Sequence, residues 1–272
     1  MRGRIRRIVG CAAVAGLLFG CAGERASTEP SAQLSATVIQ SNLDLSRGTI
    51  RVQVTNAGDA PVRVDDLTLA APPFPERTSR DRAVIQPGRR INFRVRYGEP
   101  TCSGQTPTLG PASARLVADG RDARISVEDS SNVLRRLLGL GCGRQRLADV
   151  VEIDLGQTWT PAPGGQALMG SIELRRVSAG PVVALEKVAG SVAYTLQPID
   201  DTEPVATLEP DQAALSIPVR AVALRCDPHA RAEGKKNYVF PLWFSLDGGP
   251  QIHVEVKGDV GIQSAFDTLC GP

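Results

Sequence analysis

The amino-acid sequence predicts a mostly β protein made of two tandem antiparallel β-sandwiches. Short runs that alternate apolar and polar residues recur along the chain, and turns rich in glycine, proline, asparagine and aspartate separate them. This is the pattern of half-buried strands. The order of these runs occurs twice, at an offset of about 113 to about 128 residues, which is the signature of an internal repeat. Two cysteines also fall late in each half of the chain.

Three landmarks of the first half have counterparts in the second half, although few residues are identical. The matched segments are 34–40 with 147–153, 48–54 with 170–177, and 83–88 with 206–211. After the last landmark each half continues with an alternating strand that leads to a cysteine, two further strand-like runs, a short helical stretch and a second cysteine. We therefore interpret the chain as the product of an internal duplication.

The strands of the first half are predicted from period-two alternation. Ile50, Val52 and Val54 point to one face, and a turn at residues 56–59 follows them. The apolar positions on either side of residues 65–66 change parity, which predicts a β-bulge that returns them to the core face. The other apolar strand positions are Val62, Val64, Leu67, Leu69, Ile91, Phe93, Val95, Tyr97, Leu116, Val117, Ile125 and Val127.

The second half repeats this pattern of short strands. Its apolar strand positions are Ile172, Leu174, Val192, Tyr194, Leu215, Ile217, Val219, the run 238–246, Ile252, Val254 and Val256. About six or seven short strands per half, with turns between them, resemble immunoglobulin-like sandwich modules in architecture. The tryptophan that lies between two inter-sheet cysteines in antibody domains is missing, so the resemblance names no family.

Each half is predicted to end in a short helix before its last cysteine. The first apolar stripe consists of Val133, Leu134, Leu137 and Leu138, and the second of Ile262, Ala265, Phe266 and Leu269. Residues 130–132 offer capping oxygens to the first helix, and Asp259 precedes the second. Gly139 and Gly141 are predicted to end the first helix.

The N-terminal segment is predicted to be an export signal. Arginines at positions 2, 4, 6 and 7 precede an apolar run, residues 8–19, that is too short to span a bilayer. Leu18, Gly20 and Cys21 follow the pattern L-x-[GA]-C, so residues 1–22 resemble the signal peptide and lipobox of bacterial lipoproteins. The resemblance implies removal of residues 1–20, a fatty-acyl lipid such as palmitate on Cys21, and a protein anchored in the membrane on the exported side of the cell envelope.

The mature chain is expected to begin with a flexible tether, residues 21–31, followed by two domains, residues 32–144 and 145–272. A short and stiff junction is expected near residues 143–146. Without the four signal arginines, the 31 basic residues fall to 27 against 29 acidic ones, so the mature chain is nearly neutral. This balance lacks the excess of positive charge that general nucleic-acid binding requires.

Cys11 leaves with the signal and Cys21 carries the lipid, so four cysteines remain, and in an exported protein they predict two disulfides. Three connectivities are possible in principle. The repeated cysteine frame favours pairing within each half, Cys102 with Cys142 and Cys226 with Cys270.

The sequence contains no catalytic signature of the types G-x-S-x-G, H-E-x-x-H, phosphate loop or C-x-x-C. His253 alternates with apolar strand residues and is expected at the surface. His229 has the C-x-x-H spacing of a metal pair with Cys226, but that cysteine is better used in a disulfide. The acidic residues at 65–66 and 200–203 lack the regularly spaced Asp, Asn and Gly residues of a dedicated calcium-binding loop. We expect no catalysis, no cofactor and no metal.

Two surfaces are candidate interaction sites. Seven arginines lie between residues 77 and 96, and Arg90, Arg94 and Arg96 share the polar face of one strand, where guanidinium groups fit carboxylate or phosphate. A solvated strand face is the alternative. The second surface is formed by Val239, Pro241 and Trp243, which are expected to face outward from their strand. Burial against the first domain is the alternative there.

The sequence thus predicts a lipid-anchored envelope protein with a non-catalytic binding, scaffolding or assembly role. The expected partners are the membrane, through the lipid on Cys21, and an envelope protein, an anionic envelope polymer or a phospholipid head group at the arginines. One alternative is a small-molecule or metal-binding lipoprotein that serves a transporter, which a concave pocket between the sandwiches favours. The other is a carboxylate-dependent envelope enzyme, which clustered acids in a cleft favour.

Overall fold

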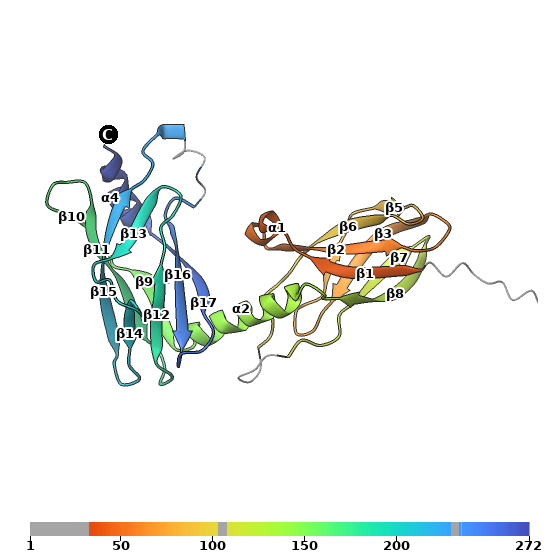
Figure 1. The fold of residues 1–272 in the computed structure, drawn as a ribbon, viewed down its shortest axis with the longest axis horizontal. Helices are drawn as coiled ribbons and strands as arrows, with labels where there is room; N and C mark the ends of the chain where they lie inside the picture. The colour runs from red at the N-terminus through yellow and green to blue at the C-terminus, as the bar shows by residue number, and fades with distance from the viewer. Residues whose placement is uncertain (1–32, 103–107, 230–233, 235, 272) are drawn as a thin grey trace, which may run out of the picture. The chain divides into compact units, whose positions relative to one another are not determined.

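The computed structural model describes residues 33–102, 108–229, 234 and 236–271, and these residues form a mostly β protein (Figure 1). We call the strands before residue 130 the first strand set. They are β1 (Leu34–Ile39), β2 (Thr49–Asn56), β3 (Val62–Ala70), β4 (Arg77–Ser79), β5 (Ala83–Ile85), β6 (Arg90–Arg96), β7 (Ser113–Ala118) and β8 (Arg121–Glu128), with the short helix α1 (Asn42–Ser46) between β1 and β2.

The helix α2 (Val133–Ala148) leads to the second strand set. That set contains β9 (Val151–Leu155), β10 (Thr160–Pro161), β11 (Leu168–Arg176), β12 (Val183–Val188), β13 (Tyr194–Pro198), β14 (Ala206–Leu208), β15 (Ala214–Ala223), β16 (Val239–Leu246) and β17 (Ile252–Lys257). The helix α4 (Val260–Asp267) and the 3-10 turn η1 (Thr268–Cys270) follow. None of the helices in the described residues is long and apolar enough to cross a membrane.

The first strand set forms one bent sheet in the order β4-β3-β7-β8-β1-β2-β6, and β5 also pairs with β3. All of these pairs are antiparallel except β1 with β8, which is parallel and connects the two layers of the sandwich (Figure 1). The order leaves β4 and β6 as the two edge strands. This topology makes the arginine-rich strand β6 the last strand of the pairing order.

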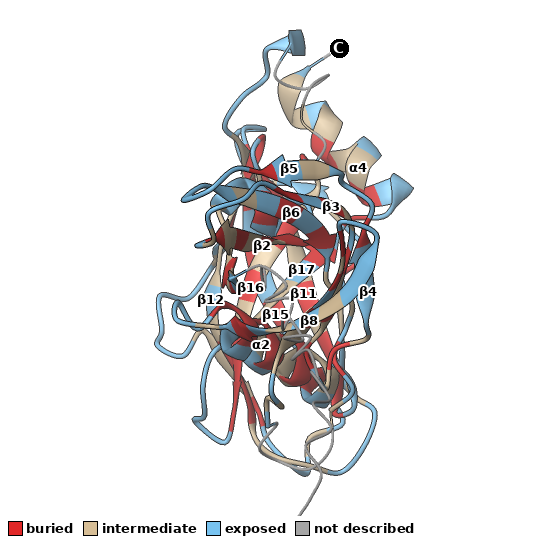
Figure 2. Ribbon diagram, turned by 90° about the vertical axis from the view of Figure 1, so that its right-hand side faces the viewer, coloured by how far each residue is buried: buried red, intermediate tan, exposed pale blue. Residues whose placement is uncertain are grey.

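The second strand set forms two sheets, β10-β11-β15-β13 with β9 on β11, and β14-β12-β16-β17. Each strand set has its own hydrophobic core, and the buried residues alternate with exposed ones along the strands (Figure 2). Phe93, at 0% exposure, represents the first core, and Tyr194, Phe240, Phe244 and Phe266, all at 0%, lie in the second. The alternation in the sequence therefore identified the core faces of most strands.

The β-bulge predicted in β3 is present. The register between β3 and β7 shifts between Val64 and Leu67, and the apolar residues on both sides of the shift are buried. Val192 was expected in a strand with Tyr194, but it precedes β13 and is 53% exposed. The segment 147–153, which the sequence matches with 34–40, includes the end of α2 at Ala148 and the start of β9 at Val151, whereas 34–39 is a strand throughout.

The first predicted helix does not end at its glycines, and this prediction was wrong. The helix α2 runs on through Gly139, Gly141 and Gly143, across the expected junction. Gly141 is buried, and a Cβ atom there would lie 2.7 Å from ring carbons of Pro100. This glycine allows the close approach of helix and loop, so it serves packing rather than termination.

The cap of α2 also differs from the prediction. Asn132 makes no side-chain cap bond, and Asp129 accepts hydrogen bonds from the backbone N–H groups of Leu134 and Arg135 instead, both at 3.1 Å. In α4, Asp259 is the N-cap residue and its Oδ1 accepts from the N–H of Ile262 at 2.8 Å. Carboxylates that accept from the first turn stabilise both helices.

Two disulfides join the cysteines in the pairing that the repeated frame favours. Cys102 bonds to Cys142 with a Cα–Cα distance of 5.5 Å, and Cys226 bonds to Cys270 with a distance of 5.1 Å. Each bond ties the loop after a strand to the helical segment that closes the corresponding half of the sequence. Two crosslinks of this kind suit an oxidising compartment.

Candidate functional site: an arginine groove

The strand β6 presents its arginines to solvent. Arg90, Arg94 and Arg96 are exposed, whereas the intervening Phe93 and Val95 are 0% and 1% exposed and belong to the first core. This is the orientation that the alternation predicts, because successive side chains of a strand point to opposite faces. The three arginines therefore stand on the outer face of the sheet.

The two edge strands of the bent sheet meet at these arginines. The backbone N–H of Arg94 donates a hydrogen bond to Oδ2 of Asp81 at 3.2 Å, and Asp81 lies shortly after the end of β4. At the other end, a Cβ atom on Gly98 would lie 3.0 Å from Nη2 of Arg77, the first residue of β4. β4 and β6 thus run antiparallel beside each other, with the Asp81 carboxylate bridging one end.

A groove of about 760 Å³ opens along this seam. Its lining residues are Arg47, Thr49, Arg77, Thr78, Ser79, Arg80, Asp81, Arg94 and Arg96. The lining thus carries five guanidinium groups against a single carboxylate. In the described residues, no ion pair is found for Arg47, Arg80 or Arg96, so most of this positive charge is uncompensated by neighbouring side chains.

Asp44 is a buried carboxylate beside the groove that contacts Arg94, one of its lining residues. This residue lies in α1, is 3% exposed, and forms a capping box with Ser41. Its carboxylate contacts Nε of Arg51 at 2.8 Å and Nε of Arg94 at 4.0 Å. Burial opposes ionisation of Asp44, but the hydrogen bonds from Ser41 and the charge of Arg51 outweigh it, so the pKa of Asp44 lies below its ordinary value. The ionised form of Asp44 is thus favoured, and its carboxylate contacts two arginines, of which Arg94 lines the groove.

The groove differs in membership from the predicted arginine face. It includes Arg94 and Arg96 but not Arg90, and it adds Arg77 and Arg80 from the opposite edge. Those two belong to the arginine-rich segment noted in the sequence, but only the meeting of β4 with β6 brings them opposite the predicted pair. Arg47, which ends α1, was missed because nothing in the local sequence links it to a segment so far along the chain.

The second predicted surface lies on the outer face of β16. Val239, Pro241 and Trp243 are each partly buried, and they alternate with Phe240 and Leu242, which are fully buried. Neighbouring strands of the same sheet cover Trp243 in part. These three residues are therefore less exposed than the arginines of β6.

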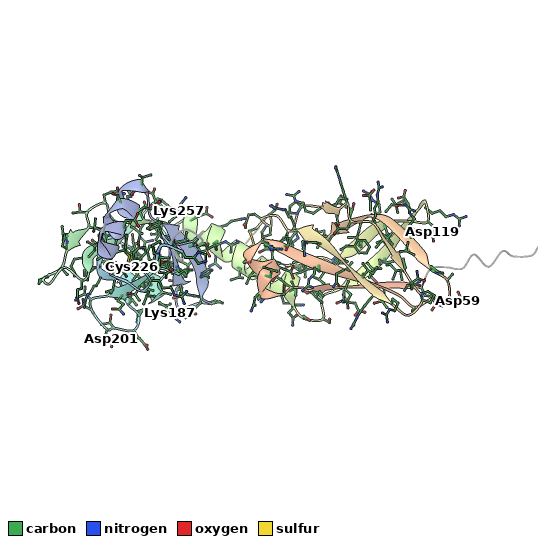
Figure 3. All side chains as sticks on the ribbon, turned by 90° about the horizontal axis from the view of Figure 1, so that it is seen from above. Asp59, Asp119, Lys187, Asp201, Cys226 and Lys257 are labelled. Carbon is green, nitrogen blue, oxygen red and sulfur yellow. A yellow bond between two sulfur atoms is a disulfide. The ribbon has the colours of Figure 1, made fainter. Side chains whose placement is uncertain are left out.

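Trp243 lies in a row across three strands. Its ring centre is 5.0 Å from that of His253 on β17, and Nζ of Lys187 on β12 lies 5.2 Å from the indole centre. Figure 3 labels Lys187 at the surface of this sheet. Burial lowers the pKa of His253 from its ordinary value, and Arg144 and Lys236 act in the same direction against Glu255. Lys187 and the ring of His253 are thus intramolecular partners of Trp243.

The remaining candidates do not assemble into a site. Cys226 is in a disulfide, and Asp65 pairs with Arg63 at 3.0 Å. Within the described residues, no three side chains of the His, Cys, Asp or Glu type converge so as to hold a metal ion. Cys21, the predicted lipidation position, lies outside the described residues.

Comparisons with known proteins give little beyond a distant likeness to solved structures. No family model matches the chain, and no curated protein is significantly similar to it. A protein of unknown function from Porphyromonas gingivalis W83 is 18% identical, with 84% of this chain and 99% of that chain covered and a TM-score of 0.24. The YadV chaperone is 14% identical, with 83% and 98% covered and a TM-score of 0.20. CBD12 from CALX1.2 is 13% identical, with 78% and 79% covered and a TM-score of 0.21.

Proposed function

We propose that the chain consists of two tandem sandwich modules that arose by duplication. The pairing order supports this. β2 lies between β1 and β6 in the first strand set, as β11 lies between β9 and β15 in the second. β7 likewise lies between β3 and β8, as β16 lies between β12 and β17, and β5 pairs with β3 as β14 pairs with β12.

A turn that occurs in both strand sets supports the same proposal. Asp119 and Asp247 both precede a glycine in the hairpin before the last strand of each set, and both have a positive φ, 48° and 50°. Asp119, labelled in Figure 3, exchanges two hydrogen bonds with Arg63: its N–H donates to the carbonyl, and its Oδ1 accepts from the N–H of that residue. Asp247 makes the same two bonds with Val182. Identical local chemistry at matched positions is expected of modules with a common ancestor.

The proposed location is the exported face of a bacterial membrane, with a lipid on Cys21. The L-x-[GA]-C pattern at residues 18–21 supports this, and two disulfides suit an exported protein. Cys21→Ser is expected to block processing, because the peptidase requires the lipid-modified cysteine, and to leave a precursor of higher mass. Intact-mass analysis of membrane fractions tests this. A mature, membrane-bound protein with an unmodified Cys21 would contradict the proposal.

The proposed function is non-catalytic binding of an anionic partner in the arginine groove. The single observation that carries it is the convergence of five arginines from α1, β4 and β6 on one concavity that contains only one carboxylate. Guanidinium groups lose their protons too rarely to act as acids or bases near neutral pH, but they bind carboxylate, sulfate and phosphate through paired donors. The groove therefore offers chiefly anion-binding chemistry, and its one carboxylate, Asp81, accepts a hydrogen bond from the N–H of Arg94.

The test compares two double charge reversals with the same change in net charge. Arg94→Glu with Arg96→Glu alters the groove, whereas Arg220→Glu with Arg225→Glu alters two exposed arginines in and just after β15. Binding of fluorescent dextran sulfate to the full chain is measured by anisotropy at rising salt, with uncharged dextran as a blank. The groove variant is expected to lose at least about tenfold in affinity and the control less than about twofold. Equal losses in the two variants would show that net charge alone is responsible.

A further inference from the structure

The groove has the form of a channel between two rows of arginines. One row is Arg94 and Arg96 on β6, and the other is Arg77 and Arg80 at β4. Arg94 and Arg96 stand two residues apart on one strand face, so their Cα atoms are about 7 Å apart. The opposite row runs antiparallel to it, as the contacts of Asp81 and Gly98 require. Charges therefore repeat along the channel as well as across it.

We propose that this channel binds a linear phosphodiester polymer, with successive phosphates held between the two arginine rows. The inference rests on the proposed function and specifies its ligand. A monovalent anion engages one or two guanidinium groups and leaves the others uncompensated, whereas a chain with repeated charges neutralises both rows. Linked contacts of this kind raise affinity well beyond that of each contact alone.

The walls of the channel favour phosphate over carboxylate. A carboxylate has two oxygens in one plane and is suited to a single guanidinium fork, as in the pairing of Arg and Asp side chains. The oxygens of a phosphodiester are arranged tetrahedrally, so they reach donors on two opposite walls. Thr49 and Thr78 line the same channel, but their hydroxyl groups bond to the carbonyl of Asp44 and to the hydroxyl of Thr68, so the ligand donors of the channel are its arginines.

The lining also discriminates among phosphate polymers. Single-stranded nucleic acids are held largely by bases that stack on aromatic side chains. The lining of the groove in the described residues contains no aromatic residue. The groove can therefore bind the phosphates of a polymer backbone through its charges, but it has no aromatic surface on which bases could stack. A polymer of glycerol phosphate or sugar phosphate units fits these walls better than RNA or DNA.

Asp81 acts in this scheme as an internal competitor for the arginines. Its carboxylate is the one negative charge in the lining, and its Oδ2 accepts from the N–H of Arg94. Asp81→Asn keeps an oxygen that accepts this bond but removes the charge. Loss of one exposed like charge is expected to tighten polymer binding about two- to fivefold.

The experiment uses the full chain in a nonionic detergent and a labelled short oligomer of glycerol phosphate. Glycerol phosphate monomer, at the same total phosphate, measures the contribution of linkage. An oligogalacturonate of similar length provides carboxylates in place of phosphates, and mixed micelles with phosphatidylglycerol provide lipid head groups. The oligomer is expected to bind at least about tenfold more tightly per phosphate than the monomer, and more tightly than either other ligand.

The variants separate the failure of this inference from that of the proposed function. If Arg94→Glu with Arg96→Glu weakens oligomer binding at least about tenfold, Arg220→Glu with Arg225→Glu leaves it within about twofold, and Asp81→Asn tightens it, the channel is the polymer site. Equal affinity for monomer and oligomer, or a preference for oligogalacturonate or for the lipid micelles, would overturn the polymer assignment while the groove remained an anion site. Unchanged binding of every anion in the groove variant would overturn both.

Discussion

Two glycines of α2, each of which carries the usual signal for a helix end, should respond to alanine in opposite ways. Gly139 is exposed, and a Cβ atom there would meet nothing within 4 Å. Gly141 is buried, and a Cβ atom there would lie 2.7 Å from Cγ and from Cδ of Pro100. Contacts that short force a shift, and a proline ring has little freedom to move away. The same substitution therefore tests whether the helix packs on the loop that carries Cys102.

The magnitudes follow from two effects. Alanine in place of glycine inside a helix favours folding by about 1 kcal/mol, and this effect is common to both positions. Overpacking of a well-filled contact costs about 1–3 kcal/mol, and it applies at position 141 alone. Gly139→Ala is thus expected to stabilise the protein by about 1 kcal/mol. The free energy of unfolding of Gly141→Ala is expected to be about 1–3 kcal/mol lower than that of Gly139→Ala, because the gain in helix propensity is the same in both variants.

Urea unfolding followed by far-ultraviolet circular dichroism, with both disulfides intact, measures this difference. With a slope of about 2 kcal/mol per M, a gap of about 2 kcal/mol separates the two midpoints by about 1 M. Adding Pro100→Ala to Gly141→Ala should recover much of the loss, whereas adding it to Gly139→Ala should not, as a double-mutant cycle will show. Equal midpoints for the two single variants would refute the close approach of Gly141 to Pro100.

Further predictions concern Phe266 in the second core, the hydrogen bonds of Arg176, and the loss of stability at acid pH through Asp44. Phe266→Ala should cost about 3–5 kcal/mol, read from the same unfolding curves, because the ring is 0% exposed and contacts the aromatic rings of Trp159, Tyr194 and Phe240. Arg176→Ala should cost roughly 3 kcal/mol, since its guanidinium group donates to four backbone carbonyls. The pKa of Asp44 is lower in the folded than in the unfolded protein, so its contribution to stability is present above about pH 4 and is lost as the pH falls further. Asp44→Asn should therefore flatten the acid limb of a plot of unfolding free energy against pH, and an unchanged limb would contradict the assignment.

The sequence predicted local features well because their signals are local. Alternation identified the buried face of β6, and the change of parity at residues 65–66 identified the bulge in β3. The sequence did not predict the end of α2 correctly, because Gly139 and Gly141 carry the usual signal for a helix end and the helix continues past both. Gly141 packs closely on Pro100 inside the helix, and no local pattern reveals this contact.

The candidate site was predictable only in part for a related reason. The alternation of β6 gives the orientation of Arg94 and Arg96, but the groove exists because the sheet bends until its edges, β4 and β6, lie side by side. The order of strands in a sheet cannot be predicted from the sequence of any single strand. Arg47 joins the groove from the end of α1, so it has no sequence signal at all.

The arginines of β6 also lie where an unpaired edge needs protection, and this alternative makes a different prediction. β15, which occupies the same place in the pairing order, is covered by β13, and its outer face carries Ser216, Pro218 and Arg220 rather than a row of arginines. Charged residues on an exposed edge discourage pairing with other chains, and lysine performs this task as well as arginine. Phosphate recognition by paired donors instead requires the guanidinium fork.

Arg94→Lys with Arg96→Lys separates the two roles because it keeps the charge and removes the fork. The variant is expected to elute from a size-exclusion column at the same volume as the unaltered protein under either role. Binding of the glycerol phosphate oligomer should fall at least about fivefold, which corresponds to roughly 1 kcal/mol, if the forks hold the ligand. Full retention of affinity would mean that charge alone suffices. The convergence of Arg47, Arg77 and Arg80 on the same channel would then be an electrostatic feature without specific recognition of phosphate.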